Sequence, residues 1–266
     1  MTDAIDRRDA AVGGFIPART LEEYAPRYSQ HFALSRSDGV LEIRMHTNDG
    51  PALLSRGLLN GWGQVLQDAA ADRANEAVIL TGTGAHWLAG VDPASYAEPL
   101  HDWHPDLVWE QYKDGFALLE RLVLDVEVPT IAVLNGPGPR QELALLCDIT
   151  LCADTVSIAD GNFAAGSVPG DGMYLVLAEL IGPKRAAWSV YTGQSISAAE
   201  ALRAGLVSEV RPEEELLPRA HELARLILQR PRLSRRMTHN VVTRRWQREV
   251  VSTLREQYSQ QLLASR

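Results

Sequence analysis

The sequence predicts an α/β protein in which a sheet-rich core precedes a helical C-terminal region. Short apolar runs that end in glycine, as buried strands often do, alternate with longer segments of helical apolar spacing. Such alternation is typical of βαβ units with right-handed crossovers. From residue 213 to residue 264 the spacing stays helical and no strand pattern returns. We therefore expect a disordered tail (1–20), a core domain (21–210) and a C-terminal helical region (211–266).

The first expected elements are a short helix over residues 21–30 and a hairpin. Two alternating runs, FALSRSDG (32–39) and VLEIRMHT (40–47), are joined by Ser-Asp-Gly, which favours a turn between antiparallel strands. Helical spacing covers residues 53–72, 108–124, 175–181, 186–191 and 198–204. Buried strands are expected at AVILTGTG (77–84), VPTIAVLNG (128–136) and TVSIAD (155–160), and ELALLCDITLCAD (142–154) predicts a helix that runs into another strand. The C-terminal helices should break near Pro218 and Pro231.

Composition excludes several classes of function. The net charge of −8 argues against general nucleic-acid binding, which needs a basic surface. Cys147 and Cys152 lie in one apolar run, where we expect buried thiols, and no cysteine and histidine spacing of a metal site appears. No apolar run approaches the roughly 20 residues of a membrane span, and the first residues lack the apolar region of a signal peptide. We therefore expect a cytoplasmic protein without metal or cofactor.

Two strand-to-loop junctions are candidates for chemistry. They are TGTGAHWLAGVD (81–92) and NGPGPRQELALLCDI (135–149). Each places backbone N–H groups at the end of a buried strand, next to the start of a helix. Such amides and the positive end of a helix dipole stabilise developing negative charge. Glycine-rich strand exits are also ordinary turns, so it is the pair of junctions that favours a site.

An ordered set of motifs resembles the crotonase (enoyl-CoA hydratase/isomerase) superfamily. The motifs are T-G-x-G…L-A-G-V-D, V-P-x-I-A-x-x-N-G…E-L-A-L-L-C-D-I, G-S-V-P-G-D-G and Y-T-G-Q…A-G-L-V-x-E-V. The resemblance runs from about residue 32 to the C terminus. It implies a core of repeated ββα units, a C-terminal helical region for oligomerisation and active-site closure, and a small-molecule substrate. It also implies self-association as a trimer or a dimer of trimers.

The resemblance assigns an oxyanion hole to the two junctions. The backbone N–H of Val91 matches the first donor, and Asp92 is expected to cap the helix that follows. The second donor is open, because Pro139 has no N–H. Gly138 or Arg140 would donate a backbone amide, or the Arg140 guanidinium would reach the oxyanion directly.

The hydratase pattern is incomplete. Glu142 matches the first of two catalytic glutamates, whereas Asn162 stands where the second is expected. Because an amide cannot act as a general base at neutral pH, two-carboxylate hydration is in doubt. Glu142 alone would shuttle a proton, as in isomerases, or would only cap its helix.

Further stretches are similar to the β-diketone hydrolase branch, typified by 6-oxocamphor hydrolase. They are R-M-H-T-N (44–48), the spacing around residues 101–103, S-V-P-G-D-G and E-E-L-L-P-R-A. The branch cleaves a C–C bond between two carbonyls by a retro-Claisen reaction, without CoA or metal. Its site implies catalytic roles for His46 and Asp171. Its other polar positions are changed, since two histidines align with Arg140 and Asn162 and a glutamate aligns with Gln261.

Several of these residues also fit a purely structural role. His46 would be a half-buried strand residue bonded to backbone, and Asp171 would cap a helix that begins at Met173. Trp87 and His86, next to the first junction, would line an apolar pocket or only pack. For the whole chain, three functions stay open: β-diketone hydrolysis, hydration or isomerisation of an enoyl-CoA thioester, and ligand binding without turnover.

Overall fold

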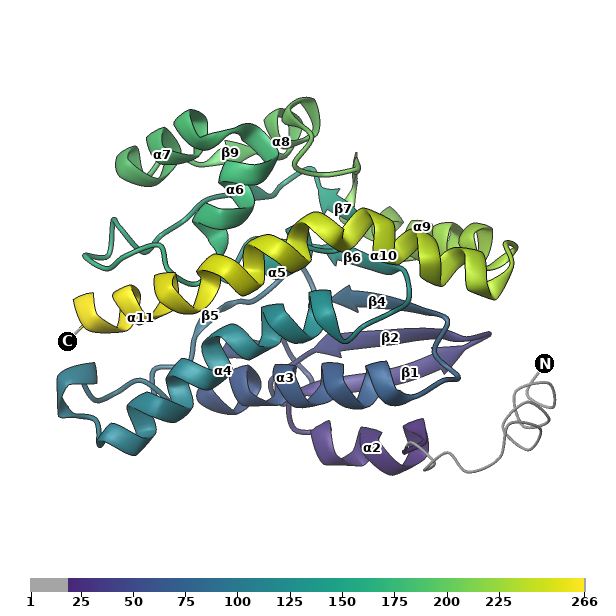
Figure 1. The fold of residues 1–266 in the computed structure, drawn as a ribbon, viewed down its shortest axis with the longest axis horizontal. Coiled ribbons are helices and arrows are strands. Elements are labelled where there is room, and N and C mark those ends of the chain that lie inside the picture. Colours follow the sequence, from purple (N-terminus) through teal and green to yellow (C-terminus); the bar gives the residue numbers. More distant parts are fainter. Residues whose placement is uncertain (1–18, 266) are drawn as a thin grey trace.

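The computed structural model describes residues 19–265 and places a six-stranded sheet at the centre of the molecule (Figure 1). The strand order is β1-β2-β4-β6-β7-β10. The β1–β2 pair is antiparallel and every other neighbouring pair is parallel. The strands are β1 (Phe32–Ser37), β2 (Val40–Met45), β4 (Ala77–Thr81), β6 (Thr130–Leu134), β7 (Ile149–Ala153) and β10 (Glu209–Arg211). The predicted α/β class is confirmed.

The predicted hairpin is confirmed, and its turn has a clear cause. Asp38 and Gly39 both have positive φ angles, of 50° and 82°. Two such residues in succession make the turn whose twist matches that of antiparallel strands. The central strands β4 and β6 are buried along their whole length, as parallel strands covered on both faces should be.

Helices occupy the segments where helical spacing was found. Those of the core are α2 (Leu21–Tyr28), α3 (Arg56–Ala71), α4 (Pro105–Leu124), α5 (Glu142–Leu145), α6 (Met173–Ile181), α7 (Pro183–Thr192) and α8 (Ala198–Ala204), with a 3-10 turn η1 (Leu100–Asp102). The C-terminal ones are α9 (Glu213–Leu228), α10 (Arg232–Glu249), the π-helical turn η2 (Val250–Leu254) and α11 (Arg255–Ala264). Figure 1 shows α10 and α11 as one long yellow stretch that crosses the molecule from beside α9.

Three details differ from the sequence-based expectations. Pro218 lies inside α9 without ending it, whereas Pro231 does separate α9 from α10. A proline costs an interior helix about 3 kcal/mol. Burial of Leu216, Ala220 and Ala224 along α9, which packs on β4, β6 and β7, offsets this cost.

The short strands outside the main sheet form the remaining differences. The strand expected at residues 155–160 is only β8 (Ser157–Ile158), and it pairs with β9 (Ile196–Ser197) in a separate sheet. Residues 53–54, expected to be helical, form β3 (Leu53–Leu54), which pairs with β5 (Gly90–Val91). The expected tail at residues 1–20 falls mostly outside the described residues. No helix within residues 19–265 is long and apolar enough to cross a membrane.

Candidate active site

The two glycine-rich junctions lie side by side at the carboxyl ends of β4 and β6. Asn135 joins them, since its Oδ1 accepts from the N–H of Gly82 (3.1 Å) and its Nδ2 donates to the carbonyl of His86 (2.9 Å). The N–H of Trp87 donates to the carbonyl of Pro137 (3.1 Å). The predicted meeting of the two junctions is therefore confirmed.

Glycine is required where the junctions touch. A Cβ on Gly138, whose φ is 150°, would overlap the backbone of Leu88. Trp87 is fully buried, and its indole Nε1–H donates to the carbonyl of Arg140 (3.0 Å). This hydrogen bond links Trp87 of the first junction to the second loop. His86 is half-buried, and its Nδ1 has no hydrogen-bond partner within the described residues.

Val91 lies in β5, which pairs with β3, and hydrogen bonds to the segment around β3 flank Val91 on both sides. The N–H groups of Ala89 and Asp92 donate to carbonyls of Ala52 (2.7 Å) and Leu54 (2.9 Å). The Val91 side chain is 50% exposed, so its identity matters little to a backbone donor. The expected cap at Asp92 is wrong in one respect: its Oδ1 accepts from the N–H of Ala94 (3.1 Å) in a turn, and no helix begins there.

Arg140 is the centre of a buried polar cluster. Its φ of 62° is unusual for a residue other than glycine and turns the side chain inward from the second loop. The guanidinium Nε lies 2.7 Å from Oε1 of Glu142, and Nη1 lies 3.9 Å from Oδ2 of Asp171. Nη2 donates to the carbonyl of Gly115 in α4 (3.2 Å). Arg140 and Glu142 are buried to 9% and 1% exposure, so Arg140 is not a surface arginine.

Asp171, Asn162 and Gln261 form a hydrogen-bonded chain beside Arg140. Nδ2 of Asn162 donates to Oδ2 of Asp171 (3.0 Å), and Nε2 of Gln261 donates to Oδ1 of Asn162 (2.9 Å). Asp171 does not cap α6, whose N-cap is Gly172 without a side-chain bond. Oδ1 of Asp171 and Oε1 of Gln261 are buried and have no hydrogen-bond partner within residues 19–265. Five of the predicted site residues therefore meet: Arg140, Glu142, Asn162, Asp171 and Gln261.

The charges of this cluster do not balance. The carboxyl groups of Glu142 and Asp171 lie beside one guanidinium, and a third carboxyl group, that of Asp160, lies close enough to influence both. Burial raises the pKa of Glu142 to about 8, although Arg140 opposes the shift and Asp171 adds to it. Burial and the charge of Asp171 raise the pKa of Asp160 to about 6. At neutral pH the cluster therefore holds a protonated Glu142 beside a charged guanidinium, because like charges disfavour full ionisation.

His46 lies outside this cluster. It follows β2, is buried, and its Nδ1 accepts from the N–H of Asp49 (3.2 Å). Its own N–H donates to the carbonyl of His31 (2.9 Å). Within the described residues, none of its hydrogen bonds or ion pairs reaches Arg140 or Asp171.

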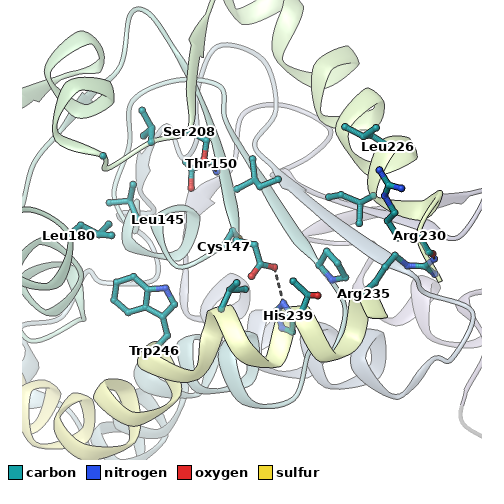
Figure 2. A pocket seen from close by; sticks show the side chains of 18 of the residues that line it. Leu145, Cys147, Thr150, Leu180, Ser208, Leu226, Arg230, Arg235, His239 and Trp246 are labelled. Carbon is teal, nitrogen blue, oxygen red and sulfur yellow. Dashed lines mark hydrogen bonds and ion pairs between the residues drawn. The ribbon is translucent and has the colours of Figure 1, made fainter. Parts of the chain in front are cut away.

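A cavity of about 990 Å³ lies between the start of β7 and helices α9 and α10, away from the Arg140 cluster (Figure 2). It is lined mainly by apolar side chains of α9, α10 and the start of β7. Within it Nδ1 of His239 lies 2.8 Å from Oδ2 of Asp148, and Nε2 of His239 lies 2.8 Å from the carbonyl of Val126. Both ring nitrogens of His239 therefore have partners within the protein. The volume of this cavity is not enough to identify it as the catalytic site. No metal-binding group of three His, Cys, Asp or Glu side chains occurs within residues 19–265.

Sequence reasoning missed several residues around Arg140. They are Gly115, Gln111, Asp160, Tyr96 and Tyr258. Tyr258 and Gly115 come from α11 and α4, which are far apart in sequence and pack together only in the fold. No local motif marks them.

Comparison with known proteins gives one family and two kinds of relative. A family model described as enoyl-CoA hydratase/isomerase matches residues 35–264. A "Probable enoyl-CoA hydratase" of Mycobacterium bovis is 35% identical over 172 residues, which span 63% of each chain and thus less than two thirds of that relative. The carnitinyl-CoA dehydratase of Salmonella arizonae is 34% identical over 207 residues, or 76% of each chain.

Solved structures point to the same fold. A β-diketone hydrolase from Anabaena sp. PCC 7120, bound to (S)-3-oxocyclohexyl acetic acid, has a TM-score of 0.86 and 30% identity over 91% of this chain and 96% of that one. An enoyl-CoA hydratase/isomerase from Mycobacterium paratuberculosis has a TM-score of 0.82 and 25% identity over 89% of this chain and 94% of that one.

Proposed function

Because the chain belongs to the enoyl-CoA hydratase/isomerase (crotonase) family, we propose that it is an enzyme that hydrolyses a C–C bond of a cyclic β-diketone through a stabilised enolate. The observation that carries the proposal is the chain of hydrogen bonds from Gln261 through Asn162 to Asp171, which leaves one buried carboxylate oxygen free beside Arg140. The reaction needs a held water molecule, an oxyanion site and a proton donor.

The water would be held by Asp171 and Gln261. Asn162 uses one oxygen of Asp171 and the amide nitrogen of Gln261, so Asp171 Oδ1 and Gln261 Oε1 remain as acceptors. A water molecule has two protons to donate and would satisfy both oxygens, leaving a lone pair for attack. Asp171 then acts as the general base itself, so no histidine is needed at residue 162.

The steps balance with the groups present. The water oxygen bonds to one carbonyl carbon, and its proton passes to Asp171. Collapse breaks the ring C–C bond, and the electron pair leaves as an enolate, which the N–H of Val91 and the Arg140–Gly138 region stabilise. The protonated Glu142 gives its proton to the enolate carbon, and the proton on Asp171 restores Glu142. The products are a carboxylic acid and a ketone.

The ligand of the Anabaena neighbour supports this reaction class. Its name states a ketone and a carboxylic acid on one six-membered ring. These two groups form when water cleaves one ring bond of bicyclo[2.2.2]octane-2,6-dione. The Anabaena protein is named a β-diketone hydrolase, and its fold matches almost the whole of this chain.

The test is to incubate the purified protein with cyclic and bicyclic 1,3-diketones and follow the keto acid by NMR. Turnover in H₂¹⁸O should place one ¹⁸O in the carboxyl group. The rate of the Asp171→Asn variant should be about 10²–10⁴-fold lower than that of wild type, as expected for removal of a general base. Absence of turnover across such a panel would refute the proposal.

A second candidate is hydration or isomerisation of an enoyl-CoA thioester. It is favoured by the names of the curated relatives and by the buried, protonated Glu142. It predicts that crotonyl-CoA binds with measurable heat and that Glu142→Gln abolishes its turnover. Asn162 at the position of a second carboxylate places this candidate below the first.

We also propose that the chain assembles as a trimer or a dimer of trimers. The basis is the family resemblance. Light scattering of the purified protein tests it, and a monomeric mass would contradict it.

A further inference from the structure

Tyr258 of α11 lies in a notch that only glycine can provide. Its side chain is buried, and a Cβ on Gly115 of α4 would overlap the ring and hydroxyl of Tyr258. The carbonyl of the same Gly115 accepts a hydrogen bond from Nη2 of Arg140 (3.2 Å). The hydroxyl end of Tyr258 and the Arg140 guanidinium therefore contact one residue, on the inner side of α4.

The hydroxyl of Tyr258 has a proton to donate. Nε2 of Gln111 donates to its oxygen (3.2 Å), which occupies one acceptor site. A tyrosine hydroxyl has one donor and further acceptor capacity. Within residues 19–265, the structure records no acceptor for the Tyr258 proton. A buried donor left without an acceptor costs about 1–3 kcal/mol, so a ligand oxygen at this place would be stabilising.

The surroundings keep this hydroxyl protonated. Burial raises the pKa of Tyr258 to about 12, against the influence of Arg140, while the charge of Asp171 reinforces the shift. The side chain is therefore a hydrogen-bond donor and not a base at neutral pH. Gln111 also lies within hydrogen-bonding reach of Tyr96, whose pKa is raised by burial.

We propose that the hydroxyl of Tyr258 donates a hydrogen bond to the substrate carbonyl oxygen on which negative charge develops. This inference rests on the proposed function. It fits the loop, because Pro139 has no N–H to donate, so Tyr258 would add a donor to those of Val91 and the Arg140–Gly138 region. The ligand group that Tyr258 would bind is an uncharged ketone carbonyl.

The first test is Tyr258→Phe, which keeps the ring in its notch and removes only the hydroxyl. The matched control is Tyr112→Phe, since Tyr112 stacks on Tyr258 with ring centroids 6.3 Å apart and its hydroxyl contacts only the Arg255 carbonyl at the surface. We expect that neither variant melts at a lower temperature than wild type, since the ring packing is kept. The kcat for a diketone substrate should fall about 10²–10³-fold in Tyr258→Phe, with little change in KM, and should stay unchanged in the control.

The second test measures the hydrogen bond without turnover. The probe is 3-oxocyclohexyl acetic acid with a ¹³C-labelled ketone, observed by infrared difference spectroscopy on the protein. The bound ketone stretch should lie lower in wild type than in Tyr258→Phe. If wild type binds the ketone and the two frequencies agree, the donor assignment is wrong while the proposed function stands. If wild type neither binds this ketone nor turns over any diketone, the proposed function fails and the assignment fails with it.

Discussion

Replacing Glu142 by Gln tests whether Glu142 is protonated in the folded protein and how its protonation changes the free energy of unfolding with pH. Burial raises the pKa of Glu142 from 4.5 to about 8. Between these two values the folded protein binds a proton that the unfolded chain has released, so the free energy of unfolding decreases as pH rises. One pKa unit corresponds to about 1.4 kcal/mol, which makes the full effect roughly 4–5 kcal/mol.

The measurement is urea unfolding of wild type and Glu142→Gln from pH 5 to pH 9. Gln is neutral at every pH, so the variant should gain stability relative to wild type as pH rises, by up to that amount near pH 9. Asp160, whose pKa is raised to about 6, titrates at the lower end of this range, so the difference is read between pH 7 and pH 9. If the two stability curves run parallel through this range, Glu142 is not protonated in the folded state at neutral pH.

Glu209→Gln is the control of opposite sign. Arg219, with help from Arg211, lowers the pKa of Glu209 to about 2. Its contribution is present above pH 4.5 and is lost only as pH falls toward 2. The stability difference between Glu209→Gln and wild type should therefore be constant from pH 5.5 to pH 9. A slope in this control would mean that the Glu142 result reflects a general change of charge.

Four further substitutions test close packing and the hydrogen bonds of a buried histidine. Gly115→Ala should push α11 away from α4, lower stability by about 1–3 kcal/mol in thermal unfolding and reduce activity with it; an unchanged melting temperature would contradict the notch. Gly138→Ala should disrupt the junction of the two loops, whereas Gly161→Ala, where a Cβ meets nothing within 4 Å, should melt like wild type. His239→Ala should lower the free energy of unfolding in urea by about 1–3 kcal/mol, because it removes the hydrogen bonds to Asp148 and to the carbonyl of Val126. Thr130 still donates to Asp148 in this variant, and an unchanged free energy of unfolding would show that the His239 bonds contribute little.

The elements of the core could be predicted from local patterns. Apolar runs ended by glycine located β4 and β6, and Asp38-Gly39 located the hairpin, because these signals depend on neighbouring residues alone. Pro218 was misjudged because its cost is offset by contacts between α9 and the sheet, which no local pattern contains.

The candidate site divides in the same way. The alignment of motifs predicted a place in the site for residues 140, 142, 162, 171 and 261, and the fold places all five in one cluster. It also gave His46 a catalytic role, and within residues 19–265 the hydrogen bonds of His46 go to His31 and Asp49, so this role stays a prediction. A motif carries the order of residues along the chain, whereas their distance depends on how the elements pack.

By itself, the sequence determined the α/β class, the two backbone loops and the family, since each is encoded in short patterns of residue type. Tertiary structure alone decided the protonation of Glu142, because that depends on burial and on Asp160 and Asp171 as neighbours. Tertiary structure also decided the position of the Tyr258 side chain, because Gly115 lies 143 residues earlier and contacts Tyr258 only when α11 packs on α4. Local propensity selects elements, whereas the charge and reach of a side chain are set by what the fold places around it.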